Sequence, residues 1–97
     1  MAGPNETIHQ PIRLRIMAAL CALEKAERGL DFTRLKTLTG ATDGNLGSHI
    51  DTLARADYVA IEKLFANRRP KTLVTATRAG RRAFADHVAF LRDVIGG

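Results

Sequence analysis

The sequence predicts a mostly helical α+β domain in which two short helices precede a two-stranded hairpin with a basic tip. Apolar residues recur at helical spacing in four segments of the chain. Two runs rich in β-branched and aromatic residues, 58–63 and 72–76, flank the sequence Arg68-Arg69-Pro70-Lys71. The chain has 97 residues, of which 45% are apolar. That composition suits one core, so we expect residues 1–97 to form a single domain.

The first long helix is expected to begin at Pro11, after residues 1–7, which we expect to be disordered. The mostly polar residues 24–28 should form its last turns, and Gly29 should end the helix. One face of this helix carries Ile12, Ile16, Ala19, Leu20 and Leu23, and the opposite face carries Leu14, Met17 and Cys21. A helix that is apolar on two faces is covered on both. We therefore expect the second stripe to contact another copy of the chain.

Two short helices should follow a minimal strand at Leu30-Asp31-Phe32. Thr33 is the expected N-cap of the first, which Gly40 terminates, and Thr42 is the expected N-cap of the second, over residues 43–56. Only a few residues separate the two helices, so their axes must cross at a steep angle. This is helix-turn-helix geometry.

The helix 43–56 presents a polar outer face. Its apolar positions recur at i, i+4 and i+7 and are expected to face the core, whereas Asn45, Ser48, His49, Thr52 and Arg55 fall on or beside the opposite face. Amide and hydroxyl groups on an exposed helix can read base edges in the major groove of DNA. The alternative is an ordinary solvated face, and His49 could instead pack against the neighbouring helix.

Positive charge is concentrated after this helix. Residues 55–82 hold eight Lys or Arg and two acids, a net charge of +6, whereas residues 1–54 sum to zero. Such clustering indicates a polyanionic partner. We expect Arg68, Arg69 and Lys71, in the connection 66–71, to meet phosphate or enter a minor groove. The alternative is a charged tip that only prevents edge-to-edge aggregation.

The last helix, predicted for residues 78–95 with Thr77 as its cap, carries more apolar surface than one small core requires. Two adjoining stripes run along it. We expect this helix to pair with its copy in a homodimer, through Phe84, His87, Phe90, Leu91 and Val94 together with Leu14, Met17 and Cys21.

The string TDGNLGSHIDTLARADYVAIEK, Thr42–Lys63, resembles the recognition helix and first wing strand of winged-helix transcriptional regulators, and FANRRPKTLVTAT, Phe65–Thr77, is similar to their wing. The chain resembles in particular the short regulators related to the MarR and ArsR groups. This resemblance implies a winged helix-turn-helix with a two-stranded wing and a C-terminal dimerisation helix. It also implies a homodimeric, sequence-specific regulator bound to double-stranded DNA. The single cysteine and the lack of a secretory pattern in the first ten residues predict a cytoplasmic protein. Asp57 stands where the family usually has glycine in a left-handed turn, and Arg78 replaces a common proline.

Other classes of function find no support in the sequence. No phosphate loop, paired catalytic carboxylates or nucleophile–base set is present, so we expect neither an enzyme nor a cofactor. His9, His49 and His87 lack metal-ligand spacing, and the single Cys21 cannot supply the cysteine pair of metal sensors. No membrane span and no signal for an effector are evident. The alternatives are a protein-interaction module and a structured-RNA binder. An expected lack of exposed aromatic side chains disfavours single-stranded RNA.

Overall fold

The computed structural model describes residues 3–24 and 27–96. The elements in chain order are α1 (Glu6–His9), α2 (Pro11–Cys21), β1 (Leu30–Asp31), α3 (Phe32–Thr39), α4 (Asp43–Arg55), β2 (Val59–Ala66), β3 (Arg69–Ala76) and α5 (Arg78–Val94). The strands form one antiparallel sheet in the order β1-β3-β2. The predicted α+β class, with its helix-turn-helix and hairpin, is confirmed.

Helix α2 is the centre of the core. It contacts α1, α3, α4, α5 and β3, and Ile16, Met17 and Leu20 on it have no exposed surface. The chain's own elements therefore bury Met17 on the second face, and the expectation that Met17 contacts a second chain is wrong, whereas Leu14 and Cys21 on that face are partly buried. The helix also ends earlier than Gly29, which instead lies against the backbone of Val74 in β3.

The N-terminal segment is more ordered than its sequence predicted. Residues 1–2 lie outside the described residues, but Asn5 caps α1 by accepting a hydrogen bond from the Ile8 amide, and the Ile8 side chain is fully buried. Burial of Ile8 supplies the apolar contact that a four-residue helix needs for its stability. The expected disorder of residues 1–7 is therefore corrected for residues 3–7.

Side-chain caps set the bounds of α3 and α4. Asp31, rather than the predicted Thr33, caps α3 by accepting from the Arg34 amide, and Gly40 ends it with a left-handed φ of 72°. Thr42 caps α4 as predicted, by accepting from the Asn45 amide. The buried residues Leu46, Ile50 and Leu53 fix α4 on the core by one face only. The opposite face is left to solvent.

The hairpin of β2 and β3 is longer than predicted, because a two-residue turn at Asn67-Arg68 joins the strands. Pro70, which we expected in the connection, lies inside β3 opposite Phe65. Ala66 and Arg69 flank the turn and form its hydrogen-bonded closing pair, so the next pair, Phe65–Pro70, is a pair without ladder hydrogen bonds. A proline lacking an N–H fits there at no cost to the ladder.

A compact joint connects the hairpin to α5. Asp57 has φ of 64°, as the resemblance implied, and its carbonyl accepts a hydrogen bond from the Thr77 hydroxyl, which in turn accepts from the Gly80 amide. A side chain at Gly80 would collide with the Tyr58 carbonyl, so only glycine permits this approach. The joint fixes the direction in which α5 leaves the body.

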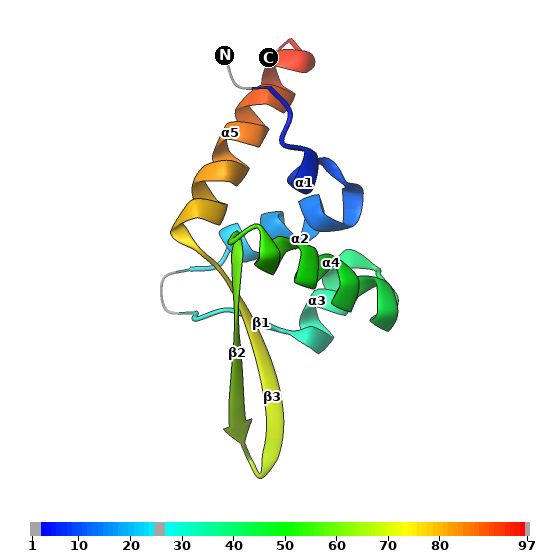
Figure 1. Cartoon of the computed structure of the whole chain (residues 1–97), viewed down its shortest axis with the longest axis vertical. Helices are drawn as coiled ribbons and strands as arrows, with labels where there is room; N and C mark the ends of the chain where they lie inside the picture. The colour runs from blue at the N-terminus through cyan, green and yellow to red at the C-terminus, as the bar shows by residue number, and fades with distance from the viewer. Residues whose placement is uncertain (1–2, 25–26, 97) are drawn as a thin grey trace.

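The molecule is elongated, with extents of 50 × 28 × 22 Å. Figure 1 shows the hairpin of β2 and β3 extending beyond the helical body at one end of the long axis, and the C-terminal part of α5 at the other end. The basic tip and the apolar end of the last helix are thus far apart.

Candidate nucleic-acid interface

On the outer face of α4, Asn45 and Ser48 are exposed to solvent. Their side chains make no hydrogen bond within the part of the chain that the structure describes, so both keep their donors and acceptors for a ligand. Thr52 is half-buried, and its hydroxyl donates to the Ser48 carbonyl at 3.1 Å. Thr52 can therefore accept a hydrogen bond from a ligand or contact it through its methyl group, but its hydroxyl already donates to the Ser48 carbonyl.

His49 lies at the edge of this face and is tied to α2. Its Nδ1 is 3.0 Å from Nη1 of Arg13, whose Nε donates to the Thr7 carbonyl. Because arginine only donates, His49 Nδ1 is the acceptor, and the proton resides on Nε2. Burial, followed by the nearby Arg13 charge, lowers the pKa of His49. His49 is thus neutral at pH 7, with Nε2–H left as a possible donor. Arg13, which positions it, had no signal in the sequence.

Arg55 on α4 forms an ion pair within its own helix. Its Nη2 lies 3.0 Å from Oδ2 of Asp51, one turn earlier, and both side chains are largely exposed. Exposed pairs of this kind are weak, about 0.3–0.5 kcal/mol, so Arg55 can leave Asp51 for a phosphate. The carboxylate of Asp51 nevertheless adds negative charge beside Arg55.

The hairpin tip carries the cations most available to an anion. Arg68 and Arg69 are exposed, and among the described residues neither joins an ion pair. Lys71 is different. It lies two residues further from the turn than Arg69, and its Nζ is 3.6 Å from Oδ2 of Asp31 in β1. The structure therefore separates the predicted set into two free arginines and one lysine held toward the body.

The two faces of the hairpin differ in character. Val59 and Val74 are buried against the helices, so the face they share, continued by Ile61, Lys63, Phe65, Pro70 and Thr72, is called the inner face. The other face, which we call the outer wing face, carries Glu62 and Lys71, which pair with Arg28 and Asp31 of the body. Outward from Ile61, the inner face extends past the helices and is uncovered.

Phe65 on the inner face is 75% exposed. The expectation that the chain has no exposed aromatic side chain is therefore wrong. The alternation of the strand pattern continues past the core to Phe65, and this continuation was the available signal. The phenyl ring and Lys63 share the inner face, so an exposed apolar group lies next to a cation there.

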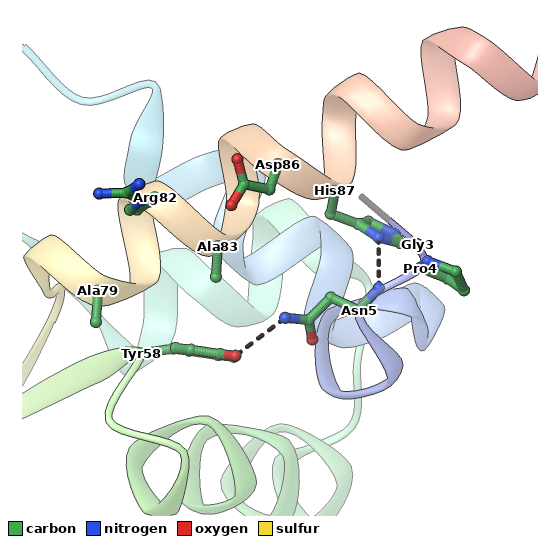
Figure 2. Close-up of a pocket in the computed structure, with 9 residues that line it drawn as sticks. All are labelled: Gly3, Pro4, Asn5, Tyr58, Ala79, Arg82, Ala83, Asp86 and His87. Atoms are coloured by element: carbon green, nitrogen blue, oxygen red, sulfur yellow. Dashed lines mark hydrogen bonds between the residues drawn. The ribbon is translucent and has the colours of Figure 1, made fainter. Parts of the chain in front are cut away.

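At the other end of the molecule, hydrogen bonds of Asn5 and His9 connect the N-terminal segment to Tyr58 and to His87 of α5. Figure 2 shows Asn5 between Tyr58 and His87: its Nδ2 donates to the Tyr58 hydroxyl at 3.0 Å, and its backbone N–H donates to His87 Nδ1 at 3.1 Å. His87 Nε2 therefore carries the proton and donates to His9 Nδ1 at 3.3 Å. His87 is fully buried, so the expectation that it contacts a second chain is corrected.

The protein is expected to lose stability as the pH falls, because His87 resists protonation in the folded state. Burial, followed by the neighbouring His9, lowers the pKa of His87 in the folded protein. Below the ordinary histidine pKa of about 6.5, the unfolded chain takes up a proton that the folded chain resists, which costs up to about 1.4 kcal/mol per pH unit. Urea unfolding at pH 7.5 and 5.5 should show this loss. In His87→Gln the loss should shrink, whereas a loss equal to that of wild type would contradict the assignment.

A surface pocket of about 410 Å³ opens beside this cluster. It is lined by Gly3, Pro4, Asn5, Tyr58, Ala79, Arg82, Ala83, Asp86 and His87 (Figure 2).

Within residues 3–24 and 27–96 no group of three metal-ligating side chains occurs, although His9 and His87 do meet. Burial raises the pKa of the Cys21 thiol, which keeps it protonated. No helix in the described ranges is long and apolar enough to cross a bilayer.

The remaining residues expected at a dimer interface keep different amounts of free surface. Leu14, Cys21 and Phe84 are half-buried against the core, and Phe90 stacks on His87 with ring centroids 5.9 Å apart. Leu91 is half-exposed, whereas Val94 and Ile95 are 64% and 79% exposed. Of the 17 residues of α5, only Gly80 and His87 are buried. The uncovered apolar surface is thus concentrated toward the end of α5.

Comparison with known proteins agrees with this geometry. The sequence pattern of the winged helix DNA-binding domain family matches residues 12–95. An uncharacterized protein of Methanocaldococcus jannaschii is 35% identical over 77 residues, 79% of each chain. A solved transcriptional regulator homologue from Pyrococcus horikoshii is 32% identical with a TM-score of 0.83, covering 96% of this chain and 88% of its own. A MarR family transcriptional regulator from Silicibacter pomeroyi is 25% identical with a TM-score of 0.71, covering 94% of this chain and 57% of its own.

Proposed function

This chain belongs to the winged helix DNA-binding domain family, and on that premise we propose that it is a transcriptional regulator that binds specific sites on double-stranded DNA as a homodimer. Two of the solved proteins to which it is similar are described as transcriptional regulators or homologues of one. As part of this proposal we assign the protein to the cytoplasm. The proposal assigns it no enzymatic role.

One observation carries the proposal: α4 has an exposed polar face and is followed by a hairpin whose two tip arginines are free. Asn45 and Ser48 offer hydrogen-bonding groups on a helix, and a helix fits the major groove, which is about 12 Å wide. The hairpin of β2 and β3 extends beyond the helical body (Figure 1). Arg68 lies in its turn and Arg69 begins β3, where an adjacent stretch of backbone or minor groove would lie. Base reading and phosphate binding are thus assigned to separate elements.

The homodimer is supported by the end of α5. Val94 and Ile95 are exposed, and Leu91 one turn earlier is half-exposed, so the helix carries an uncovered apolar end. A twofold axis there would bring identical faces together. Because this end lies opposite the hairpin tip, the axis would leave both copies of α4 and both hairpins free for one duplex. Leu14, Cys21, Phe84 and Phe90 have their residual surfaces nearer the body and remain candidates for the edge of this interface.

The test of base reading is the motif that the protein selects. Duplexes are selected from a random library by wild type, Asn45→Ala and Ser48→Ala. Each variant should lose preference at particular positions, by about 1–3 kcal/mol for a lost bidentate contact. Arg34→Ala, on exposed α3 surface, is the matched control and should select the wild-type motif. Identical motifs for all four proteins would remove Asn45 and Ser48 from the interface.

The exposed Phe65 favours a second candidate, single-stranded nucleic acid, because aromatic rings beside cations bind unpaired bases by stacking. A competition experiment separates the two candidates. Labelled duplex is challenged with unlabelled random duplex or with single strands of equal length at several salt concentrations. We expect duplex to compete more strongly at every concentration. Stronger competition by single strands would favour the second candidate.

A further inference from the structure

We propose that the inner face of the hairpin is a docking surface for one sugar–phosphate strand of duplex DNA, with Phe65 packed on deoxyribose and Lys63 on phosphate. The inference rests on the proposed function and adds a contact that neither base reading nor the tip arginines supply. It commits to a single occupant, the DNA strand that separates the major groove from the adjacent minor groove.

The direction of the inner face is the first argument. At its base this face packs on the helical layer through Val59 and Val74, and β2 contacts α4 directly. From Ile61, which is 43% exposed, to Phe65, which is 75% exposed, the same face continues outward and is open to solvent. A duplex that receives α4 in its major groove must pass one backbone strand through the space between α4 and the hairpin. The inner face borders that space.

The side chains on this face match a sugar–phosphate strand. Phe65 is 75% exposed and lies two residues from Lys63 on the same side of β2, opposite Pro70. Among the ion pairs of the described residues none involves Lys63, so its ammonium group stays available on the inner face. An alternation of apolar ring and free cation suits a polymer that alternates deoxyribose with phosphate. Charge complementarity therefore favours DNA over an apolar partner.

Distance along the strand supports the same assignment. Phe65 lies two residues before the turn residue Asn67, roughly 7 Å back along the strand at about 3.3 Å per residue. When Arg68 at the turn enters a minor groove, the ring is therefore held back at the rim. Deoxyribose forms that rim, whereas the bases lie deeper.

The test measures affinity and its salt dependence for Phe65→Ala, with Leu64→Ala as control. Leu64 is the adjacent residue on the outer wing face. Phe65→Ala should bind specific and random duplex at least about tenfold more weakly, the scale of losing one buried aromatic contact. The slope of log K against log salt should not change, because no charge is removed. Leu64→Ala should stay within about threefold of wild type, and Phe65→Leu should recover most of the affinity.

Each other outcome has a distinct meaning. Equal affinity for Phe65→Ala and Leu64→Ala, with wild type still binding duplex, overturns the docking surface and leaves the proposed function standing. Failure of wild type to bind duplex at all overturns the proposed function itself. A larger loss on single strands than on duplex would mean base stacking in place of sugar contact. A change in sedimentation without a change in DNA affinity would make a second copy the occupant, which also contradicts the proposal.

Discussion

Replacing Val94 and Ile95 together by aspartate is expected to convert the protein from dimer to monomer and to weaken binding to a two-half-site operator by roughly 10²-fold or more, the advantage of a second tethered contact. Both side chains are exposed in the single chain, at 64% and 79%, so the substitutions remove nothing from the core and the fold should persist. Their burial in a dimer would contribute roughly 1.5–3 kcal/mol per side chain. Sedimentation and operator titration measure the two effects.

Arg92→Asp is the control for charge. Arg92 is exposed near the same end of α5, and its substitution changes the charge of the chain by −2, as the double substitution does. It removes no apolar surface, so the dimer should remain. A monomeric Arg92→Asp would mean that charge, and not apolar contact, governs association. A dimer in the Val94→Asp, Ile95→Asp double variant would place the interface elsewhere.

Replacing Arg68 by glycine is expected to stabilise the protein while weakening its grip on DNA. Asn67 and Arg68 have φ of 51° and 62°, the conformation of a type I′ turn, in which glycine is strongly preferred at the second position. An arginine there is strained, and its replacement should raise the free energy of unfolding by about 1 kcal/mol. Strain of this kind often marks a functional residue. We interpret it as the cost of presenting a guanidinium at the tip.

The cost to binding follows from counterion release. Each phosphate that a cation neutralises adds about 0.9 to the slope of log K against log salt, so losing Arg68 from both copies of a dimer should flatten the slope by about 1.8. If the affinities of wild type and variant were equal at 1 M salt, this change of slope would make the variant bind DNA roughly 30-fold more weakly at 0.15 M salt. Arg69→Ala, without the φ change, should lose similar affinity and gain no stability. Arg68→Gly that binds as tightly as wild type would contradict the role of the tip.

Local signals in the sequence predicted the elements that form the interface. The cap Thr42, the i, i+4, i+7 spacing of Leu46, Ile50 and Leu53, and the position of Asp57 depend on neighbouring residues in the chain, and each prediction is confirmed. The prediction that Pro70 lies in the connection was wrong. A proline fits in β3 only at a pair without ladder hydrogen bonds, and the two-residue turn determines which pairs those are. Turn length cannot be read from a proline alone.

The errors at the other end of the molecule have a different cause. Periodicity shows which faces of a helix are apolar, but not which neighbour covers them. Met17 and His87 were therefore interpreted as dimer contacts. In the structure Met17 is buried in the core, and His87 is buried and hydrogen-bonded to Asn5 and His9. The link between Arg13 and His49 joins residues 36 positions apart and has no sequence pattern. Such contacts arise only when the chain has folded.

Footprinting of duplex fragments that the purified dimer selects from random sequence is the most direct test of the interface on α4 and the hairpin. The account predicts an enriched inverted repeat whose half-sites are centred one helical turn apart, or a small multiple of it. Protection should cover the major groove of each half-site, where α4 lies, and the adjacent minor groove, where Arg68 lies. Selection of no motif, with equal affinity for every duplex across salt concentrations, would contradict it.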